Sequence, residues 1–87
     1  MKNILIFGTG GHAKVIVDII EKQGIYNIKG FIDEHCDKEI TILGYKVLGG
    51  ESSLRDIVSS FKIYGGIIAI GDNSKRLNCR NNITKFI

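Results

Sequence analysis

The residues with the clearest chemical potential form a glycine-rich segment at residues 8–13, GTGGHA, directly after the apolar run at residues 4–7. Gly8, Gly10 and Ala13 match the G-x-G-x-x-G/A pattern. In that pattern the first glycine makes a tight turn, the second lets the backbone approach a diphosphate, and the third small residue lets a helix pack on a strand. The N–H groups and dipole of the following helix favour an anion at this turn. We therefore expect phosphate-binding residues here: Gly8, Thr9, Gly10, Gly11 and His12.

Two readings of this segment stay open from the glycines alone. A plain strand-to-helix turn that binds nothing has the same pattern, because turns commonly need glycine. His12 falls in the first helical turn, where the helix dipole disfavours its charged form but places its ring beside the anion site. It is also compatible with an ordinary surface histidine at a helix start.

Polar residues also follow two other apolar runs, at residues 28–32 and 66–70. If these runs are parallel strands, their carboxyl ends share one edge with the glycine turn, and ligands of such sheets bind there. A carboxylate presents only acceptors, so Asp33 suits the hydroxyl or N–H donors of a nucleoside, although a solvated turn carboxylate is the alternative. The candidate residues after these two runs are Asp33, Glu34, Gly71, Asp72 and Asn73.

The elements that position these residues follow from hydrophobic periodicity. Ala13, Ile16, Val17 and Ile20 recur at helical spacing and predict an amphipathic helix that ends near Gly24. Strands are predicted at residues 4–7, 28–32 and 66–71. A short hairpin or edge strand is expected within residues 40–48, around a glycine at position 44.

A second helix is predicted to begin at a serine cap, Ser52 or Ser53, and to run to about Phe61. Its inward side chains should be Leu54, Ile57, Val58 and Phe61. A last helix follows Asn73. This order predicts an α/β fold, a small Rossmann-like parallel sheet with flanking helices and right-handed crossovers.

Composition limits the class of protein. Eighty-seven residues with a hydrophobic fraction of 44% are enough for one small globular domain, residues 1–87. The N-terminus has neither a signal peptide nor a membrane-spanning run, and Cys36 and Cys79 have no metal-site or disulfide-scaffold spacing. We expect a cytoplasmic protein with no metal and no membrane partner. The net charge of +3 arises from basic residues in the last third, where no DNA- or RNA-binding motif occurs, and we interpret them as a solvated helix face and not a nucleic-acid site.

Four segments together resemble a known family. They are residues 7–15 (FGTGGHAKV), 31–34 (FIDE), 44–49 (GYKVLG) and 68–73 (IAIGDN) with Arg76. In this order they are similar to the N-terminal domain of bacterial sugar acetyltransferases, the sialic acid O-acetyltransferase and UDP-4-amino-sugar N-acetyltransferase relatives. The resemblance covers nearly the whole chain.

The resemblance implies a Rossmann-like domain that binds a nucleotide-activated sugar of the UDP-sugar type for surface glycan or sialic acid biosynthesis. It places the glycine turn and His12 at the phosphates, the acid pair Asp33 and Glu34 near the nucleoside, and residues 71–73 with Arg76 at the nucleotide or sugar. In that family acetyl-CoA and the catalytic histidine belong to a C-terminal β-helix of hexapeptide repeats, through which the proteins form homotrimers. No hexapeptide repeat occurs in these residues, so we expect the chain to bind without catalysing and to hold no cofactor itself.

Two alternatives remain open at this point. The first is a binding or regulatory module for NAD(H) or a related dinucleotide, which the glycine spacing and Asp33 permit. The second is a structural or interaction domain whose site is vacant. The sugar and base, the acetylated atom (O or N) and the oligomeric state of the chain do not follow from the sequence.

Overall fold

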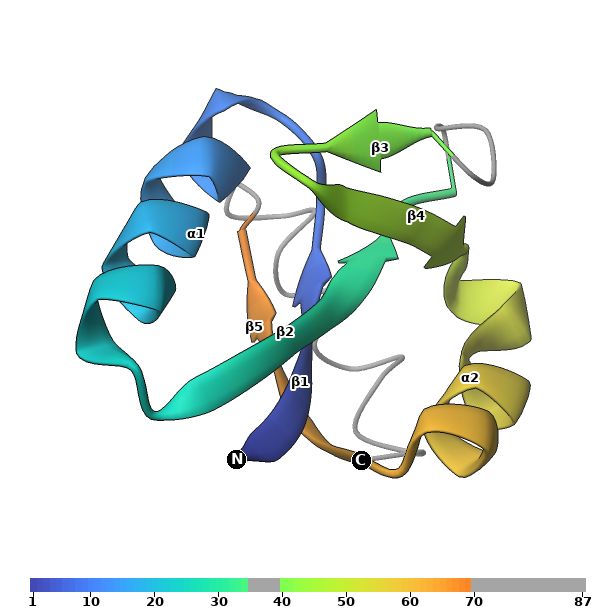
Figure 1. The fold of residues 1–87 in the computed structure, drawn as a ribbon. Coiled ribbons are helices and arrows are strands. Elements are labelled where there is room, and N and C mark those ends of the chain that lie inside the picture. The colour runs from blue at the N-terminus through green and yellow to red at the C-terminus, as the bar shows by residue number, and fades with distance from the viewer. Residues whose placement is uncertain (35–39, 70–87) are drawn as a thin grey trace.

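The computed structural model describes residues 1–34 and 40–69. A five-stranded sheet has the order β3-β4-β2-β1-β5 and is flanked by two α-helices (Figure 1). Strands β4, β2, β1 and β5 are parallel, and β3 runs antiparallel to β4 at one edge. The elements are β1 (Lys2–Phe7), α1 (Gly11–Gln23), β2 (Tyr26–Ile32), β3 (Thr41–Ile42), β4 (Tyr45–Gly49), the 3-10 helix η1 (Glu51–Ser53), α2 (Leu54–Phe61) and β5 (Ile63–Ile68). The predicted Rossmann-like α/β fold is confirmed.

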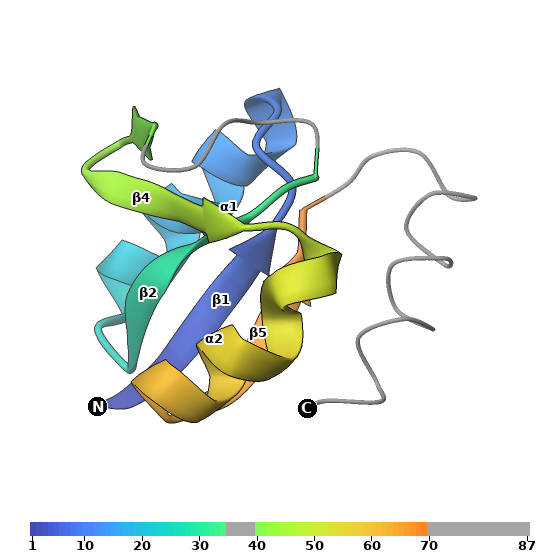
Figure 2. The same ribbon diagram turned by 90° about the vertical axis from the view of Figure 1, so that its right-hand side faces the viewer.

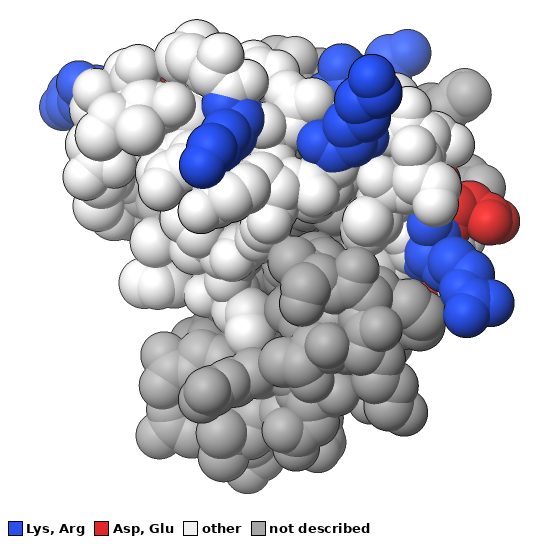
Figure 3. Space-filling view, turned by 90° about the horizontal axis from the view of Figure 1, so that it is seen from below, with Lys and Arg blue, Asp and Glu red and all other residues white. Residues whose placement is uncertain are grey.

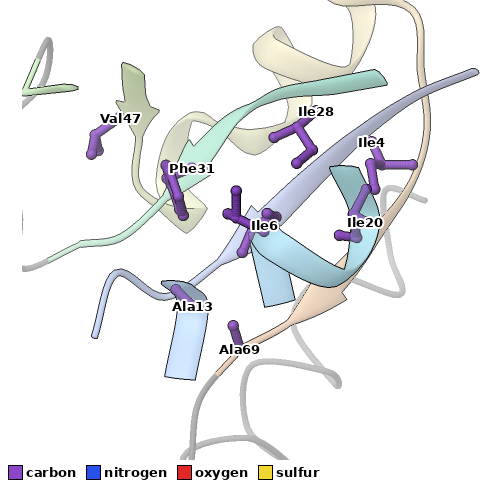
Figure 4. Close-up of a cluster of buried hydrophobic side chains, with 9 residues drawn as sticks. Ile4, Ile6, Ala13, Ile20, Ile28, Phe31, Val47 and Ala69 are labelled. Carbon is purple, nitrogen blue, oxygen red and sulfur yellow. The ribbon is translucent and has the colours of Figure 1, made fainter. Parts of the chain in front are cut away.

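The helices pack on opposite faces of the sheet (Figures 1 and 2). On the α1 face, Ala13, Val17 and Ile20 belong to one cluster of buried side chains with residues of β1, β2 and β4. Phe31 and Val47 are among them (Figure 4). On the other face, α2 packs its own apolar residues against Leu5, Phe7 and Ile32. Strand β1 is buried from position 4 to position 7 because it is covered on both sides, which explains its unbroken apolar run.

The first helix agrees with the sequence prediction. Ala13, Val17 and Ile20 are buried, and Ile16 packs against the same cluster. The helix ends at Gly24, which adopts the left-handed conformation (φ 65°) and donates its N–H to the carbonyl of Ile20. Glycine is favoured at such a position because a side chain is strained there.

Strand β5 begins three residues before the predicted strand at residues 66–71 and ends at Ile68. The prediction began the strand at the apolar run and left residues 63–65 unassigned. In the structure the edge of β1 pairs with this segment from Ile63 onward, and the Tyr64 ring stacks on Tyr26 at 6.3 Å between centroids. Gly66 is a glycine because a Cβ there would meet the buried Phe7 ring. Pairing with β1 therefore extends the strand beyond its apolar run.

Strands β1 and β2 also begin two residues earlier than predicted. Their first residues, Lys2 and Tyr26, are direct partners in the parallel ladder, so the pairing extends beyond the apolar runs. The expected hairpin is confirmed as β3 and β4. Its two turn residues, Leu43 and Gly44, both have positive φ (52° and 87°), which suits the twist of a tight hairpin.

The second helix has the predicted extent and inward face, and one of the two predicted serines is at its start, but the predicted capping hydrogen bond is not made. Ser53 occupies the N-cap position of α2 and its side chain makes no capping hydrogen bond. The N–H of Ser52 instead donates to the Glu34 carboxylate at 2.9 Å. The Glu34 side chain, just after β2, therefore accepts a backbone hydrogen bond where the helical segment begins. Local sequence does not reveal this contact because the two residues are far apart in the chain. The predicted last helix lies outside the described residues.

Candidate functional site

Three backbone hydrogen bonds join the strand ends at the carboxyl edge of the sheet. Gly8 N–H donates to Ile32 O (2.9 Å), Asp33 N–H to Gly49 O (2.9 Å) and Ala69 N–H to Phe7 O (2.8 Å). The ends of β4, β2, β1 and β5 are therefore held side by side. The glycine turn and Asp33 meet at this edge, as the sequence predicted from parallel topology.

The glycine turn changes direction at Gly8, whose φ of 105° is strained for any residue with a side chain. Gly10 is the N-cap of α1, with extended backbone (φ −74°, ψ −171°), and it offers no side chain to cap the helix. The first turn of α1 contains no acidic residue. The positive end of this helix is therefore neither capped nor neutralised by its own side chains, which suits an anion.

Gly10 and Gly11 are not required by packing. A Cβ built on either residue meets no heavy atom within 4 Å, and neither has a positive φ. Both backbones face open space. By contrast, Gly8 is needed for the turn itself. Neither packing against the described residues nor backbone conformation thus requires glycine at positions 10 and 11. Close approach of a ligand to the backbone is a physical reason for having glycine there.

Asp33 lies one strand away from the glycine turn and is linked to it. The Thr9 hydroxyl donates to Asp33 Oδ2 at 2.7 Å, a length typical of a hydrogen bond to a carboxylate. The bond is partly buried and joins the β1–α1 turn to the end of β2. Sequence reasoning selected both residues but did not foresee this contact, because it spans 24 positions of the chain.

Glu34 has a structural contact of its own. Its carboxylate accepts the Ser52 N–H and lies against Gly50, where a Cβ would collide with it. The side chain thus ties the end of β2 to the start of the helical segment after β4. Its assignment to the nucleoside stays a prediction. The contribution of Gly49 and Gly50 to this edge was missed by sequence reasoning, although adjacent glycines after a strand were a usable signal.

His12 is exposed in the first turn of α1, beside Gly10 and Gly11. Its ring is accessible to a ligand at the helix N-terminus. The remaining predicted residues, Gly71, Asp72, Asn73 and Arg76, lie outside the described residues. Their roles stay predictions.

Other surfaces of the described chain have different chemistry. An open groove of about 540 Å³ lies away from the carboxyl edge, between the β2–β4 region and the end of α2, and includes Lys29, Tyr45 and Phe61. The end of the molecule opposite the carboxyl edge of the sheet carries scattered Lys and Arg side chains (Figure 3). Among the described residues, no group of three or more His, Cys, Asp or Glu side chains is arranged to hold a metal, and no helix has the length and apolarity to cross a membrane.

The family of the chain follows from comparison with known proteins. The model of the PglD N-terminal domain matches residues 3–83. The chain belongs to the PglD N-terminal domain family. This confirms the resemblance to the N-terminal domain of sugar acetyltransferases. A comparison with curated protein sequences gives no match.

Solved structures of related domains share the fold. A crystal structure of a variant of GDP-perosamine N-acetyltransferase from Caulobacter crescentus, in complex with CoA and GDP-perosamine, is 26% identical with a TM-score of 0.82. The match covers 100% of this chain and 40% of that chain. A second variant of the same enzyme, with the same ligands, gives the same values. The chain therefore spans well under half the length of these relatives.

The repressor RSP of the Rex family is also similar in structure. Its complex with NADH is 22% identical, with a TM-score of 0.73, and the match covers 98% of this chain and 41% of that chain. At this identity the likeness shows a shared Rossmann-like fold alone.

Proposed function

We propose that this chain binds a nucleotide-activated sugar at the carboxyl edge of its sheet, as the substrate-binding domain of a sugar acetyltransferase. The observation that carries the proposal is the uncapped N-terminus of α1 behind two glycines that face open space, with the Asp33 carboxylate one strand away. Family membership and the GDP-perosamine and CoA bound to a relative support it.

The described residues offer groups suited to two parts of such a ligand, its diphosphate and its nucleoside. The diphosphate lies over Gly10 and Gly11, where helix N–H groups and the helix dipole stabilise its charge. The nucleoside extends toward Asp33 and Glu34, the acid pair after β2. His12 contacts the phosphates in this proposal, and residues 71–73 with Arg76, which lie outside the described residues, contact the nucleotide or the sugar.

The whole protein, in this proposal, transfers an acetyl group from acetyl-CoA to oxygen or nitrogen of the sugar in the bacterial cytoplasm, for surface glycan or sialic acid biosynthesis. A further β-helix domain supplies the acetyl-CoA site and the catalytic histidine, and assembles the protein as a homotrimer. Acyl transfer needs a base within hydrogen-bond reach of the nucleophile and an acyl donor held beside it. The described residues present no such pair, and we expect the 87 residues to bind substrate without turnover.

Isothermal titration calorimetry of the 87-residue chain tests the binding step. UDP- and GDP-linked amino sugars are titrated in parallel with NAD⁺ and NADH. We expect weak binding of one sugar nucleotide and none of the dinucleotides. Preference for NAD⁺ or NADH would instead support the dinucleotide module, and no heat with any ligand would support a vacant structural domain.

A thiol-release time course tests the absence of catalysis. The chain is mixed with acetyl-CoA and the amino-sugar nucleotide that binds, and free thiol is followed beside a His12→Ala variant. Both proteins should stay at background. Turnover that disappears in His12→Ala would overturn the proposed division of labour between the domains.

A further inference from the structure

We infer that Thr9 is a positioning residue that holds the Asp33 carboxylate toward the ribose, so that the site selects a ribonucleotide over its 2′-deoxy form. The inference deepens the proposed function and rests on it. Its starting point is the 2.7 Å hydrogen bond from the Thr9 hydroxyl to Asp33 Oδ2.

The Asp33 carboxylate is fixed through its backbone as well as its side chain. The preceding residue, Ile32, accepts the Gly8 N–H, and the N–H of Asp33 itself donates to Gly49 O. Strand β2 is thus bound on both sides where Asp33 leaves it. Thr9 adds the constraint that backbone bonds cannot supply, because it sets the direction of the carboxylate.

Thr9 is held in place by the same turn that forms the anion site. It lies between Gly8, whose φ of 105° and bond to Ile32 O define the turn, and Gly10, the N-cap of α1. The residue that orients the carboxylate and the backbone proposed to meet the diphosphate are therefore neighbours in one turn. A change at Thr9 need not disturb the anion site, since Thr9 acts through its side chain.

The geometry of the sheet identifies the group that Asp33 meets. Adjacent strands lie about 4.8 Å apart, so a carboxylate after β2 is one strand spacing from the anion site after β1. In a nucleoside diphosphate the ribose is the next unit after the phosphates. Its 2′-hydroxyl donates the hydrogen bond that an acid at this position of a Rossmann-like sheet accepts. A carboxylate that Thr9 already orients loses less side-chain freedom on binding than an unrestrained one, which increases affinity by about 2- to 12-fold.

The test measures selectivity as well as affinity. UDP and GDP are first titrated into the 87-residue chain by calorimetry, and the tighter one is compared with its 2′-deoxy form. We expect the wild-type chain to bind the ribonucleotide at least about tenfold more tightly, the low end for a hydrogen bond to a charged group. Thr9→Val should reduce this ratio to about threefold or less, and Thr9→Ser, which keeps the hydroxyl, should restore it.

A double-mutant cycle separates positioning from direct contact. If Thr9 acts through Asp33, Thr9→Val has no further effect on affinity in an Asp33→Ala background. Effects that add in full would show that Thr9 binds the ligand by itself and would overturn the inference. An unchanged ratio in folded Thr9→Val would overturn it as well. Thr9→Ala replaces Thr9→Val in both measurements if circular dichroism shows that the valine variant does not fold.

Failure of the inference is distinguishable from failure of the proposed function. Equal wild-type affinity for the ribonucleotide and its 2′-deoxy form refutes selection by Asp33 and leaves nucleotide binding intact. Absence of binding to UDP, GDP and the amino-sugar nucleotides refutes both.

Discussion

Replacing Gly10 with valine should greatly weaken nucleotide-sugar binding and leave the fold intact. Gly10 has φ −74° and ψ −171°, in the extended region that β-branched residues adopt readily, and a Cβ there meets nothing within 4 Å. The added side chain would occupy the space over the N-terminus of α1. A diphosphate that approaches the backbone at this point would therefore be excluded.

The stability change of this variant should be small because two opposing contributions nearly cancel. Replacing glycine at a compatible backbone conformation stabilises the fold by about 0.4–1 kcal/mol through the unfolded state. Loss of glycine at an N-cap costs a similar amount, since aliphatic residues are poorer than glycine there. The free energy of unfolding should stay within about 1 kcal/mol of the wild-type value.

The loss of binding should be much larger. Exclusion of the diphosphate removes at least one hydrogen bond to a charged group, about 1.5–3 kcal/mol. This corresponds to a rise of roughly 10- to 150-fold in Kd. Calorimetry with the sugar nucleotide measures the affinity, and urea denaturation followed by circular dichroism measures the stability of the same sample.

Two other glycines provide controls. A Cβ on Gly65, in β5, also meets nothing within 4 Å, so Gly65→Val makes the same substitution in open space away from the turn and should keep wild-type affinity. Gly8→Ala should lose stability, by about 1–3 kcal/mol, because φ is 105° at this residue. The reasoning is refuted if Gly10→Val binds as tightly as Gly65→Val, or if its loss of binding coincides with unfolding.

Three further outcomes are expected. Asp33→Ala should weaken sugar-nucleotide binding by about 1.5–3 kcal/mol in calorimetry, and a loss of only a few tenths would leave Asp33 a purely structural residue. Gly66→Ala should destabilise the fold by about 1–3 kcal/mol in urea denaturation, because its Cβ enters the ring of Phe7, which is 1% exposed. The pKa of Tyr45 is raised, first by its 2.7 Å hydrogen bond to the Glu21 carboxylate and then by burial and the Glu21 charge, so Glu21→Gln should lower it when tyrosinate absorbance is titrated. The folded state holds this proton more tightly than the unfolded state, whose Tyr45 pKa is about 10. The contribution of Tyr45 to stability is therefore present below a pH of about 10 and is lost as the pH rises through the folded pKa. Denaturation of Tyr45→Phe beside wild type across that pH range checks the sign.

The local sequence determined the elements whose signals are complete within a few residues. The first helix follows from apolar residues three and four apart and from the glycine that ends it, because helical packing and capping depend on near neighbours. The buried run of β1 predicts a strand covered on both faces, and Leu43 and Gly44 lie at the centre of the expected hairpin. The position of the glycine turn at the carboxyl edge follows from the strand–turn–helix order.

Tertiary structure alone decided where pairing extends and what the polar side chains contact. Strand β5 begins at Ile63, three residues before the predicted strand, because β1 supplies a ladder for it, and the Phe7 ring accounts for Gly66. Glu34 reaches the Ser52 N–H, and Thr9 reaches Asp33, across 18 and 24 positions of the chain. Such contacts depend on which strand ends lie side by side, and a periodic pattern along one segment carries no information about that arrangement.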